Sequence, residues 1–402
     1  MKIGIYGGTF NPPHLGHMAA ARDVARALEL DKVLLVPDNA PPHKEMPEGS
    51  ASPQQRLEMV ELMADRLGKG FEASDIELTR KGKSYTADTL EALARRYPKD
   101  ELYLLVGTDM FLTLDTWYQP QRICKYAHIA AFGRQAGDTE SFHWQKKKLK
   151  KQFGARVKIV TLEDLVEVSS SQLREQLAQG QGRALLDESI YGYILMRRLY
   201  GTNADLTQLS LEDLRACSYS MVRAKRIPHI KGTEQEAALL ARKNGADEEK
   251  ARRAAILHDC TKYFPAEKQL SICEKCGILI DQIARENTGL LHAKSGAAVA
   301  RQVFGMPEDI CSAIFWHTTG HAGMTLLEKI IYIADYAEPS RPYDWCAELR
   351  AIVEEDLDAG VLYGLDYSIR RNQEANKPVH PDGIAARDWM AAEQKRKGEQ
   401  HG

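Results

Sequence analysis

The sequence lacks the features of a membrane-spanning or secreted protein. It contains no run of about 18 consecutive apolar residues. No signal peptide precedes the apolar segment that follows Met1 and Lys2. Its 7 cysteines are scattered and odd in number, which fits reduced thiols better than a disulfide framework. These absences predict a cytoplasmic protein.

A strong charge of one sign is also missing. The net charge is −2, and neither half of the chain has the basic excess of a dedicated nucleic-acid-binding protein. With 44% hydrophobic and 27% charged residues, the composition is that of a globular protein rather than a disordered one. No internal repeat or low-complexity segment occurs. We therefore expect small-molecule partners, no nucleic acid and no membrane, and the sequence leaves homo-oligomerisation open.

The length predicts two domains. A chain of 402 residues exceeds what one ordinary core accommodates, and domains of roughly 200 residues are typical. Residues 201–211 are polar and rich in turn-forming residues, as linkers are. We expect a first domain over residues 1–200 and a second over 212–402.

The first domain has the pattern of an α/β fold. Short apolar segments typical of buried strands alternate with segments of helical periodicity. The expected strands are residues 2–8, 32–38, 102–109 and 155–160, and two clear helices are 15–30 and 52–67. Ser52 caps the second of these helices, and Pro53 occupies its first position. This order predicts a doubly wound parallel sheet, a Rossmann-like fold that binds ligands at the carboxyl ends of its strands.

From Ser171 onward only helical patterns remain, which predicts an all-α second domain. The patterns cover residues 171–179, 188–200, 212–226, 234–245, 250–263, 292–305 and 326–338. The adjacent His258 and Asp259 fall inside one of these expected helices. The charged segment 391–402 is expected to be a frayed end.

The stretch "GIYGGTFNPPHLGH", Gly4 to His17, predicts an anion site. A strand ending in Gly7 and Gly8 leads to a helix whose first turn holds His14 and His17, so backbone N–H groups, the positive helix end and two imidazoles meet. Glycines let a polyphosphate approach the backbone closely. The sequence has neither G-x-x-x-x-G-K-[ST] nor G-x-G-x-x-G here, so it supports neither a P-loop ATPase nor a dinucleotide-binding Rossmann site.

This stretch resembles the H-x-G-H signature of the nucleotidyltransferase superfamily. Further segments resemble, in the same order, motifs of the bacterial nicotinate-nucleotide adenylyltransferases: "GGTFNPPHLGH", "PPHK", "SYTADTL", "GTDMFLTLDTW" and "VSSSQLR". The resemblance implies adenylyl transfer from ATP, with Mg²⁺ on its phosphates, to nicotinate mononucleotide. The products would be nicotinate adenine dinucleotide and pyrophosphate.

The resemblance also implies site residues. The catalytic ones would be His14, His17 and Arg174, and the nucleotide-binding ones Gly7, Gly8, Thr9, Phe10, Lys44, Tyr85, Thr86, Gly107, Asp109, Trp117, Arg134, Ser169, Ser170 and Ser171. Trp117 would offer a face to the nicotinate ring, with its carboxylate held near Tyr85 and Thr86. Taken alone, several of these residues have simpler explanations, since a Trp is often core, a strand-end Asp often caps a helix, and isolated basic residues are usually solvated. An acceptor such as pantetheine phosphate is the alternative substrate.

Histidines and aspartates at metal-ligand spacing mark the second domain. They are His229, His258, Asp259, His292, His317, His321 and Asp335. In "AILHDCTKY" a nitrogen ligand and a carboxylate are adjacent in an apolar segment, where an unpaired charge is costly unless a cation neutralises it. One such histidine alone would more often belong to a core or a surface. The ordered set predicts a metal site.

The ordered set is similar to that of HD-domain metal-dependent phosphohydrolases, and "HIKGT", "LLHAKSGA", "WHTTG" and "YIADYAEPSR" resemble the YqeK-type branch. This implies symmetrical hydrolysis of diadenosine tetraphosphate to two ADP, with two divalent metals, iron or another first-row metal. One metal would be held by His229, His258, Asp259 and Asp335, and the other by His292, His317 and Asp259 as the bridging catalytic ligand. Lys262 and Arg341 would contact phosphates, and His321 lies outside the minimal pattern. The alternatives are another nucleotide substrate or a nucleotide-sensing regulatory module.

Overall fold

The structure is a computed structural model that describes residues 1–39, 46–80, 82, 84–133, 139–162 and 168–401. The chain divides into two compact units, Met1–Asn203 and Ala204–Gly402. The division lies within the polar segment 201–211 that the sequence marks as a linker.

The first unit is built on a parallel sheet of six strands in the order β3-β2-β1-β4-β5-β6. The strands are β1 (Lys2–Gly8), β2 (Lys32–Pro37), β3 (Phe71–Ala73), β4 (Glu101–Gly107), β5 (Ala127–Gly133) and β6 (Val157–Thr161). Ile5 of β1 lies opposite Leu34 of β2 on one side and Leu104 of β4 on the other. The winding direction reverses between β1 and β4, and in open α/β sheets ligands bind beyond the carboxyl ends of strands at such a point.

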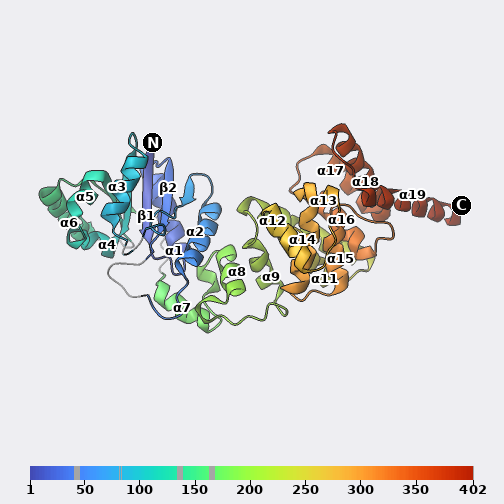
Figure 1. The fold of residues 1–402 in the computed structure, drawn as a ribbon, viewed down its shortest axis with the longest axis horizontal. Helices are drawn as coiled ribbons and strands as arrows, with labels where there is room; N and C mark the ends of the chain where they lie inside the picture. Colours follow the sequence, from blue (N-terminus) through green and yellow to red (C-terminus); the bar gives the residue numbers. More distant parts are fainter. Residues whose placement is uncertain (40–45, 81, 83, 134–138, 163–167, 402) are drawn as a thin grey trace. The chain divides into compact units, whose positions relative to one another are not determined.

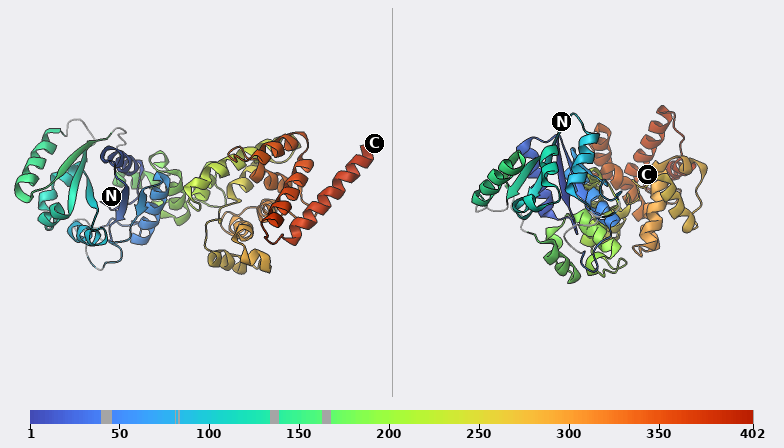
Figure 2. Two further views of the ribbon diagram at one scale, coloured as in Figure 1. Left: turned by 90° about the horizontal axis from the view of Figure 1, so that it is seen from above. Right: turned by 60° about the vertical axis from the view of Figure 1, so that its left-hand side comes forward.

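Helices cover both faces of this sheet (Figures 1 and 2). One face packs against α1 (Leu15–Leu28), α2 (Pro53–Leu67), α7 (Ser170–Ala178) and α8 (Glu188–Arg197). The other packs against α3 (Thr86–Arg96), α4 (Thr108–Leu112), α5 (Pro120–Tyr126) and α6 (Thr139–Phe153). Two apolar cores therefore sandwich the sheet, which confirms the doubly wound α/β fold.

The start of α2 is capped as the sequence predicts. Ser52 accepts a hydrogen bond from the backbone N–H of Gln55, whose side chain accepts one from the backbone N–H of Ser52. This reciprocal pair satisfies N–H groups that have no partner inside the helix. Pro53 in the first turn loses nothing, because its missing N–H would have been unpaired. The predicted cap is confirmed.

Four of the six strands were predicted, and β3 and β5 were not. β3 has only 3 residues, too few to show a periodicity. β5 reads AHIAAFG, and its alanines are poor strand formers. Pairing with β4 and β6 on either side holds β5 in the sheet despite that composition.

The second unit is all-helical over the residues that the structure describes, as predicted. Its α-helices are α9 (Leu211–Tyr219), α10 (Ile227–Asn244), α11 (Glu248–Leu257), α12 (Ala266–Lys275), α13 (Gln282–Glu286), α14 (Thr288–Gln302), α15 (Glu308–Trp316), α16 (Leu326–Ala337), α17 (Asp344–Glu355), α18 (Leu357–Glu374) and α19 (Pro381–His401). No described helix is long and apolar enough to cross a membrane.

Several expected helices end earlier than predicted, and two of these changes shape the site. The segment 212–226 breaks into α9 and the short helix η5 (Ala224–Arg226), with the Ser220 hydroxyl bonded to the Cys217 carbonyl at the break. Likewise α11 ends at Leu257, so His258 and Asp259 lie at its end and in the following turn, not inside a helix.

The charged segment 391–402 is not a frayed end, since α19 continues to His401. Alanine, glutamate, lysine and arginine are strong helix formers, and they dominate this segment. Within it, Arg396 pairs with Glu393 at 2.6 Å, and Lys397 pairs with Asp358 of α18. The helix is therefore attached to its neighbour, which a composition-based expectation of fraying overlooked.

Candidate functional site

A pocket of about 580 Å³ lies at the carboxyl ends of β1 and β4 in the first unit. Gly7 and Gly8 line it from the end of β1, and Gly107 lines it from the end of β4. Of the predicted site residues it also brings together Thr9, His14, His17, Tyr85, Thr86 and Trp117. Residues from three separate motifs thus share one cavity at the reversal point of the sheet.

His14 and His17 meet at the start of α1. His14 is the residue that precedes the helix, and its ring centroid lies 3.7 Å from that of His17. The backbone N–H of His14 donates to Nδ1 of His17 at 3.2 Å. Since Nδ1 accepts, a neutral His17 carries its proton on Nε2 and can donate it to a ligand. With the positive end of the α1 dipole, this is an arrangement for binding an anion.

The Phe10 side chain packs beneath this loop, and its predicted role in nucleotide binding stays a prediction. It is 1% exposed, and its ring lies 5.0 Å from His17 and 5.6 Å from Tyr6, centroid to centroid. A Cβ on Gly8 would meet the Phe10 ring at 3.3 Å. Glycine at position 8 therefore lets the β1 backbone pass close over the aromatic ring while staying open toward the pocket.

The start of α3 and the segment after η1 (Leu114–Thr116) also contribute to the pocket lining. Tyr85 immediately precedes α3, with Thr86 as its first residue, and Trp117 follows η1. The Tyr85 ring packs 4.4 Å from that of Tyr118, centroid to centroid. The pocket lining thus combines the two histidines at the start of α1 with aromatic residues near the α3 N-terminus.

Several other predicted residues within the described part of the chain do not line this pocket. Arg174 donates from Nη1 to the Asn11 carbonyl at 2.8 Å and from Nη2 to the Ser171 hydroxyl at 3.2 Å. Ser169 precedes α7, Ser170 and Ser171 form its first turn, and Asp109 is exposed on α4. Lys44 and Arg134 lie outside the described residues.

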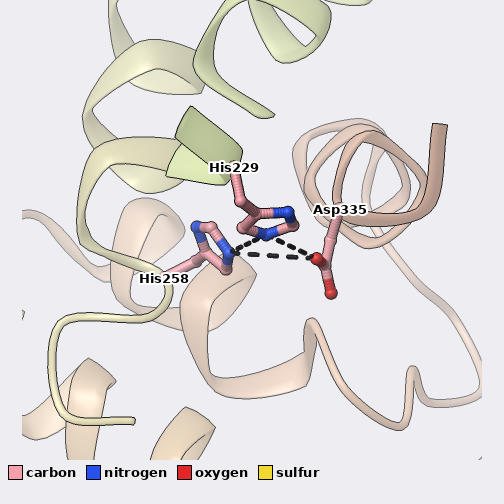
Figure 3. A group of neighbouring side chains, drawn as sticks. All are labelled: His229, His258 and Asp335. Carbon is pink, nitrogen blue, oxygen red and sulfur yellow. Dashed lines mark hydrogen bonds and ion pairs between the residues drawn. The ribbon is translucent and has the colours of Figure 1, made fainter. Parts of the chain in front are cut away.

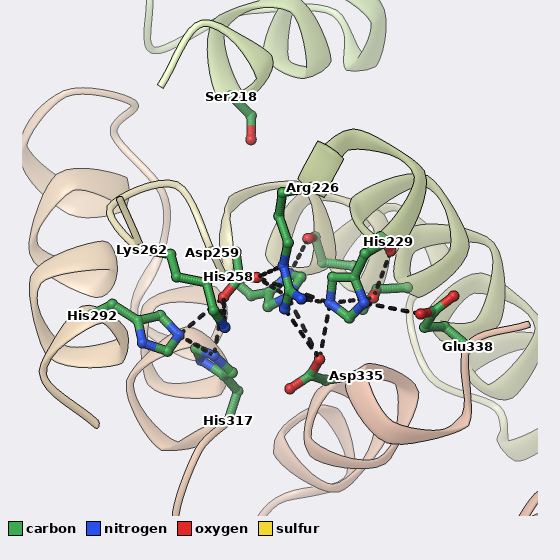
Figure 4. Close-up of polar contacts among 12 residues, drawn as sticks. Ser218, Arg226, His229, His258, Asp259, Lys262, His292, His317, Asp335 and Glu338 are labelled. Atoms are coloured by element: carbon green, nitrogen blue, oxygen red, sulfur yellow. Dashed lines mark hydrogen bonds and ion pairs between the residues drawn. The ribbon is translucent and has the colours of Figure 1, made fainter. Parts of the chain in front are cut away.

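The second unit gathers six predicted ligands into one buried cluster (Figures 3 and 4). They come from α10, the turn after α11, α14, the end of α15, and α16. Their exposed fractions are at most 8%: His229, His258, Asp259, His292, His317 and Asp335. Two groups of three have potential ligand atoms within 4.8 Å of one another, namely His229 with His258 and Asp335, and His258 with Asp259 and His317.

Nitrogen lone pairs converge in this cluster. Nδ1 of His258 lies 2.6 Å from the Ala255 carbonyl, and Nδ1 of His317 lies 2.6 Å from the Ile314 carbonyl. A carbonyl oxygen only accepts, so both Nδ1 atoms donate and a neutral ring presents a bare Nε2. Those Nε2 atoms face another histidine: His258 and His229 at 3.3 Å, His317 and His292 at 3.1 Å. Such facing nitrogens suit a shared cation.

Asp259 lies between the two histidine pairs. Its Oδ2 is 3.4 Å from Nε2 of His258 and 3.9 Å from Nε2 of His229. Its Oδ1 is 2.9 Å from Nε2 of His292 and 3.9 Å from Nε2 of His317. One carboxylate thus offers one oxygen to each pair, the geometry required of a ligand that bridges two cations.

Electrostatics favour the ligand forms of Asp259 and His317, whereas at His229 burial is outweighed by hydrogen bonds to Asp335 and Glu338, which raise the pKa of its ring. Burial alone would raise the pKa of Asp259, but His258 and Lys262 hold that pKa well below its usual range. Burial, reinforced by His292 and His258, lowers the pKa of His317 well below its usual value. Ionised carboxylates beside neutral imidazoles are the donor set of a first-row divalent metal, so the residues present fit such an ion.

Cationic side chains surround the cluster. Lys262 Nζ lies 3.0 Å from Oδ1 of Asp259, and Arg341 Nη2 lies 2.7 Å from Oδ1 of Asp335. Arg226 contacts Asp259 through Nε and lies 3.8 Å from Asp335 through Nη2. Lys262 and Arg341 were predicted. Arg226 was missed, because it was expected to be only the last residue of a helix over 212–226.

A further carboxylate supports His229 from behind. Glu338 is 1% exposed, and its Oε1 lies 3.0 Å from Nδ1 of His229. A Cβ on Gly232 would collide with Oε2 of Glu338, so glycine in "HIKGT" makes room for this carboxylate. Sequence reasoning missed Glu338, although it lies inside the quoted "YIADYAEPSR". A carboxylate behind a ligating histidine fixes the ring and its tautomer.

His321 is not part of the cluster. Its Nε2 lies 3.1 Å from Oε2 of Glu328, and its ring packs 4.7 Å from that of Trp316, centroid to centroid. Glu328 also accepts a hydrogen bond from the backbone N–H of Thr325 as part of the α16 cap. His321 therefore supports a helix start.

Comparisons with known proteins agree with the division into two parts. Residues 5–176 match the cytidylyltransferase-like family model. A probable nicotinate-nucleotide adenylyltransferase of Shewanella baltica is 39% identical over 220 residues, covering 50% of this chain and 99% of that protein. One from Carboxydothermus hydrogenoformans is 36% identical over 200 residues, covering 50% of this chain and 98% of that protein. The chain belongs to the nicotinate-nucleotide adenylyltransferase family.

The second part of this adenylyltransferase-family chain matches a different model. Residues 226–340 match the HD domain. The crystal structure of a predicted HD superfamily hydrolase involved in NAD metabolism, from Clostridium acetobutylicum, is 36% identical with a TM-score of 0.45. The match covers 46% of this chain and 99% of that chain. The chain therefore combines an adenylyltransferase-family half with an HD domain.

In the adenylyltransferase-family half, sequence reasoning missed a buried arginine that shapes the pocket. Arg56 of α2 is 1% exposed and donates to the carbonyls of Thr9 and Asp38, each at 2.7 Å. It also pairs with Oδ1 of Asp38 at 3.1 Å, while Oδ2 of Asp38 accepts from the Thr9 hydroxyl at 2.9 Å. Through these hydrogen bonds Arg56 connects the loop after β1 to the loop after β2. Its helical pattern gave no signal of this, because an arginine on a helix is usually exposed.

Glu77 is a second residue that was missed. It lines the pocket with an exposed fraction of 8%, and its Oε1 accepts from the Thr89 hydroxyl of α3 at 2.7 Å. Burial raises the pKa of its carboxyl. Glu77 connects the α3 N-terminal turn to the segment after β3, and a lone Glu in a polar stretch gave no sign of burial.

Proposed function

We propose that the first unit transfers adenylate from ATP to nicotinate mononucleotide. The supporting observation is the pocket itself, which joins an anion site at His14 and His17 to an aromatic end at Trp117. Family membership supports the same assignment. In the reaction an oxygen of the acceptor phosphate bonds to the α-phosphorus of ATP, and the bond to pyrophosphate breaks.

This reaction requires alignment and charge neutralisation rather than a general base, because the attacking phosphate is already an anion. We assign the ATP phosphates to the α1 N-terminus, the glycines that end β1, and the Nε2 donor of His17. When bound, Mg²⁺ neutralises phosphate charge. Lys44, Arg134, Asp109, Arg174, Ser169, Ser170 and Ser171 remain proposed nucleotide contacts.

We assign the acceptor to the other end of the pocket. Trp117 provides a flat apolar surface for the pyridine ring. The N–H groups at the start of α3, at Tyr85 and Thr86, suit the ring carboxylate. An amide in place of the carboxylate loses that charge-assisted interaction, which favours nicotinate over nicotinamide mononucleotide.

Replacing Trp117 with alanine should raise the KM for nicotinate mononucleotide by about 10-fold, the scale of losing one ring stacking contact, and leave the KM for ATP unchanged. Steady-state kinetics with each substrate varied in turn would measure this. Trp144→Ala is the matched control, since Trp144 is 63% exposed on α6 and does not line the pocket. Equal KM values in both variants would remove Trp117 from the acceptor site. Preferential use of pantetheine phosphate would replace the proposed acceptor.

We further propose that the HD domain is a metal-dependent phosphohydrolase that cleaves diadenosine tetraphosphate symmetrically. The observation that carries this is Asp259, with one oxygen toward each histidine pair. His229, His258 and Asp335 would hold one cation and His292 and His317 the other, with iron our choice of metal. When bound, two divalent cations neutralise charge on the attacked phosphate and lower the pKa of water.

The chain's own residues explain a central cut. Arg226, Lys262 and Arg341 provide three positive charges around the cluster. If the cations hold the two inner phosphates, these side chains are available to bind the outer phosphate on each side. Cleavage between the two inner phosphates releases two ADP, each a stabilised anion, so no strong general acid is required. A nucleotide sensor would not need a bridging carboxylate beside a ring of cations.

Replacing Arg226 with methionine should lower hydrolysis of diadenosine tetraphosphate by at least about 10-fold, the scale of losing one charged phosphate contact, while metal content stays that of the wild type. Arg223→Met is the matched control, since Arg223 is exposed three residues away. Hydrolysis rate and metal content would be measured on the same preparations. Loss of metal together with activity would mean that Arg226 only orients the carboxylates.

A further inference from the structure

The last turns of the first unit return to the loop that carries the histidines. Tyr200 lies in the short helix η4 (Leu199–Gly201), with φ of 56°, and Arg198 just before it has φ of 51°. Such left-handed conformations cost side-chain-bearing residues free energy, so packing or bonding must hold them. Tyr200 is 5% exposed, and its hydroxyl donates to Oδ1 of Asn11 at 2.8 Å.

Asn11 receives support from several directions. It is 3% exposed, and its Oδ1 also accepts from the backbone N–H of Ala51 at 3.3 Å. Its Nδ2 donates to the Ser50 hydroxyl at 2.9 Å, and its carbonyl accepts from Arg174 at 2.8 Å. Asn11 therefore fixes the chain just before the two prolines that lead to His14.

We propose that Tyr200 is a positioning residue for adenylyl transfer, acting through Asn11 on the phosphate-binding loop. The inference rests on the proposed adenylyl transfer. The hydroxyl of Tyr200 anchors Asn11, and the stiff Pro12-Pro13 segment passes this fixed position on to His14 and the start of α1. A small shift of the loop misplaces the N–H groups and the Nε2 donor that align the ATP phosphates.

The position of Tyr200 in the sequence gives this contact a further meaning. The second unit begins at Ala204, four residues later. The segment that leads into the HD domain is thus also the segment that anchors the phosphate loop. Adenylyl transfer should consequently depend on residues that an adenylyltransferase domain trimmed before Tyr200 would lose.

The chain offers a matched control in Tyr193. Its exposed fraction is 8%, and its hydroxyl donates to Oε2 of Glu58 at 2.5 Å. Neither residue lines the pocket. Tyr193→Phe and Tyr200→Phe each delete one hydroxyl and one hydrogen bond from the same end of the first unit, so both should lower stability by a similar small amount. Only Tyr200→Phe should weaken the binding of ATP.

The experiment measures Mg-ATP affinity by calorimetry and steady-state kinetics for both substrates, using full-length chains. Tyr200→Phe should weaken ATP binding and lower kcat/KM for ATP by about 5- to 10-fold, the effect of losing one hydrogen bond. The KM for nicotinate mononucleotide should stay within about twofold, as should every parameter of Tyr193→Phe. Asn11→Ala should mask the effect, so that the double variant with Tyr200→Phe is no worse than Asn11→Ala alone.

Three results would overturn the inference: wild-type ATP parameters in Tyr200→Phe, equal effects in Tyr193→Phe, or additive effects with Asn11→Ala. Failure of the proposed function is distinguishable from these. A wild-type chain that forms no dinucleotide from nicotinate mononucleotide would refute the acceptor. Calorimetry of ATP binding to Tyr200→Phe would still decide the role of Tyr200.

Discussion

His17→Ala is expected to lower the turnover of adenylyl transfer by at least about 100-fold, the scale of removing one transition-state donor. Because Nδ1 of His17 accepts from the backbone N–H of His14, we propose that its Nε2 is the group that donates to the ATP phosphates. Truncation also removes the ring that packs against His14 and Phe10, so both charge stabilisation and loop order suffer. Formation of nicotinate adenine dinucleotide would be followed at saturating ATP.

The control for this variant is His128→Ala. His128 lies on β5, stacks 4.7 Å from Tyr103, centroid to centroid, and does not line the pocket. The proposed hydrolysis of diadenosine tetraphosphate serves as an internal check, since we assign it to residues of the other unit and expect it to be unchanged in both variants. Near-normal turnover in His17→Ala would remove this histidine from the reaction.

Asp259→Ala is expected to abolish hydrolysis and leave adenylyl transfer intact. The substitution removes the one carboxylate whose two oxygens face both histidine pairs. It also leaves Arg226 and Lys262 without their shared counter-charge. Metal content should fall from about two ions per chain to one or none, as expected when a bridging ligand is lost. Metal analysis and product chromatography on one preparation would measure both.

Two controls keep the Asp259 result interpretable. Asp309→Ala removes an exposed carboxylate that pairs with Lys250 at 2.7 Å and should change neither metal content nor hydrolysis. Asp259→Asn preserves the size of the side chain if the alanine variant folds poorly, and should be equally inactive. Removal of metal from the wild type by a chelator should abolish hydrolysis, and iron(II) should restore it. Full hydrolysis by either Asp259 variant would contradict the bridging role.

Much of the fold was predictable because short segments of the sequence determine it. Ser52 and Pro53 mark the start of α2, and apolar runs mark β1, β2 and β4. β5 could not be predicted in this way, since its alanine-rich sequence becomes a strand only through pairing on both sides. The helix α11 also ends at Leu257 and His258 lies in the turn that follows, although the apolar periodicity of the segment continues.

The candidate sites also contain some residues that the sequence reveals and others that only the structure reveals. Ligand types such as His229 and Asp335 are recognisable from their spacing, and the structure does bring them together. The residues that orient these ligands are not recognisable from the sequence, because their roles depend on burial. Glu338 lies behind His229, and Arg226 contacts Asp259. Arg56 is the clearest case, since nothing in its neighbourhood distinguishes it from a solvated arginine until the structure shows it 1% exposed.

The central claim is that one chain performs two separate nucleotide reactions. Early-time product chromatography of a single iron-loaded preparation tests it most directly, with one portion given ATP and nicotinate mononucleotide and another given diadenosine tetraphosphate. The account predicts nicotinate adenine dinucleotide with pyrophosphate from the first portion and ADP alone from the second. ATP with AMP from the second portion, or no dinucleotide from the first, would contradict it.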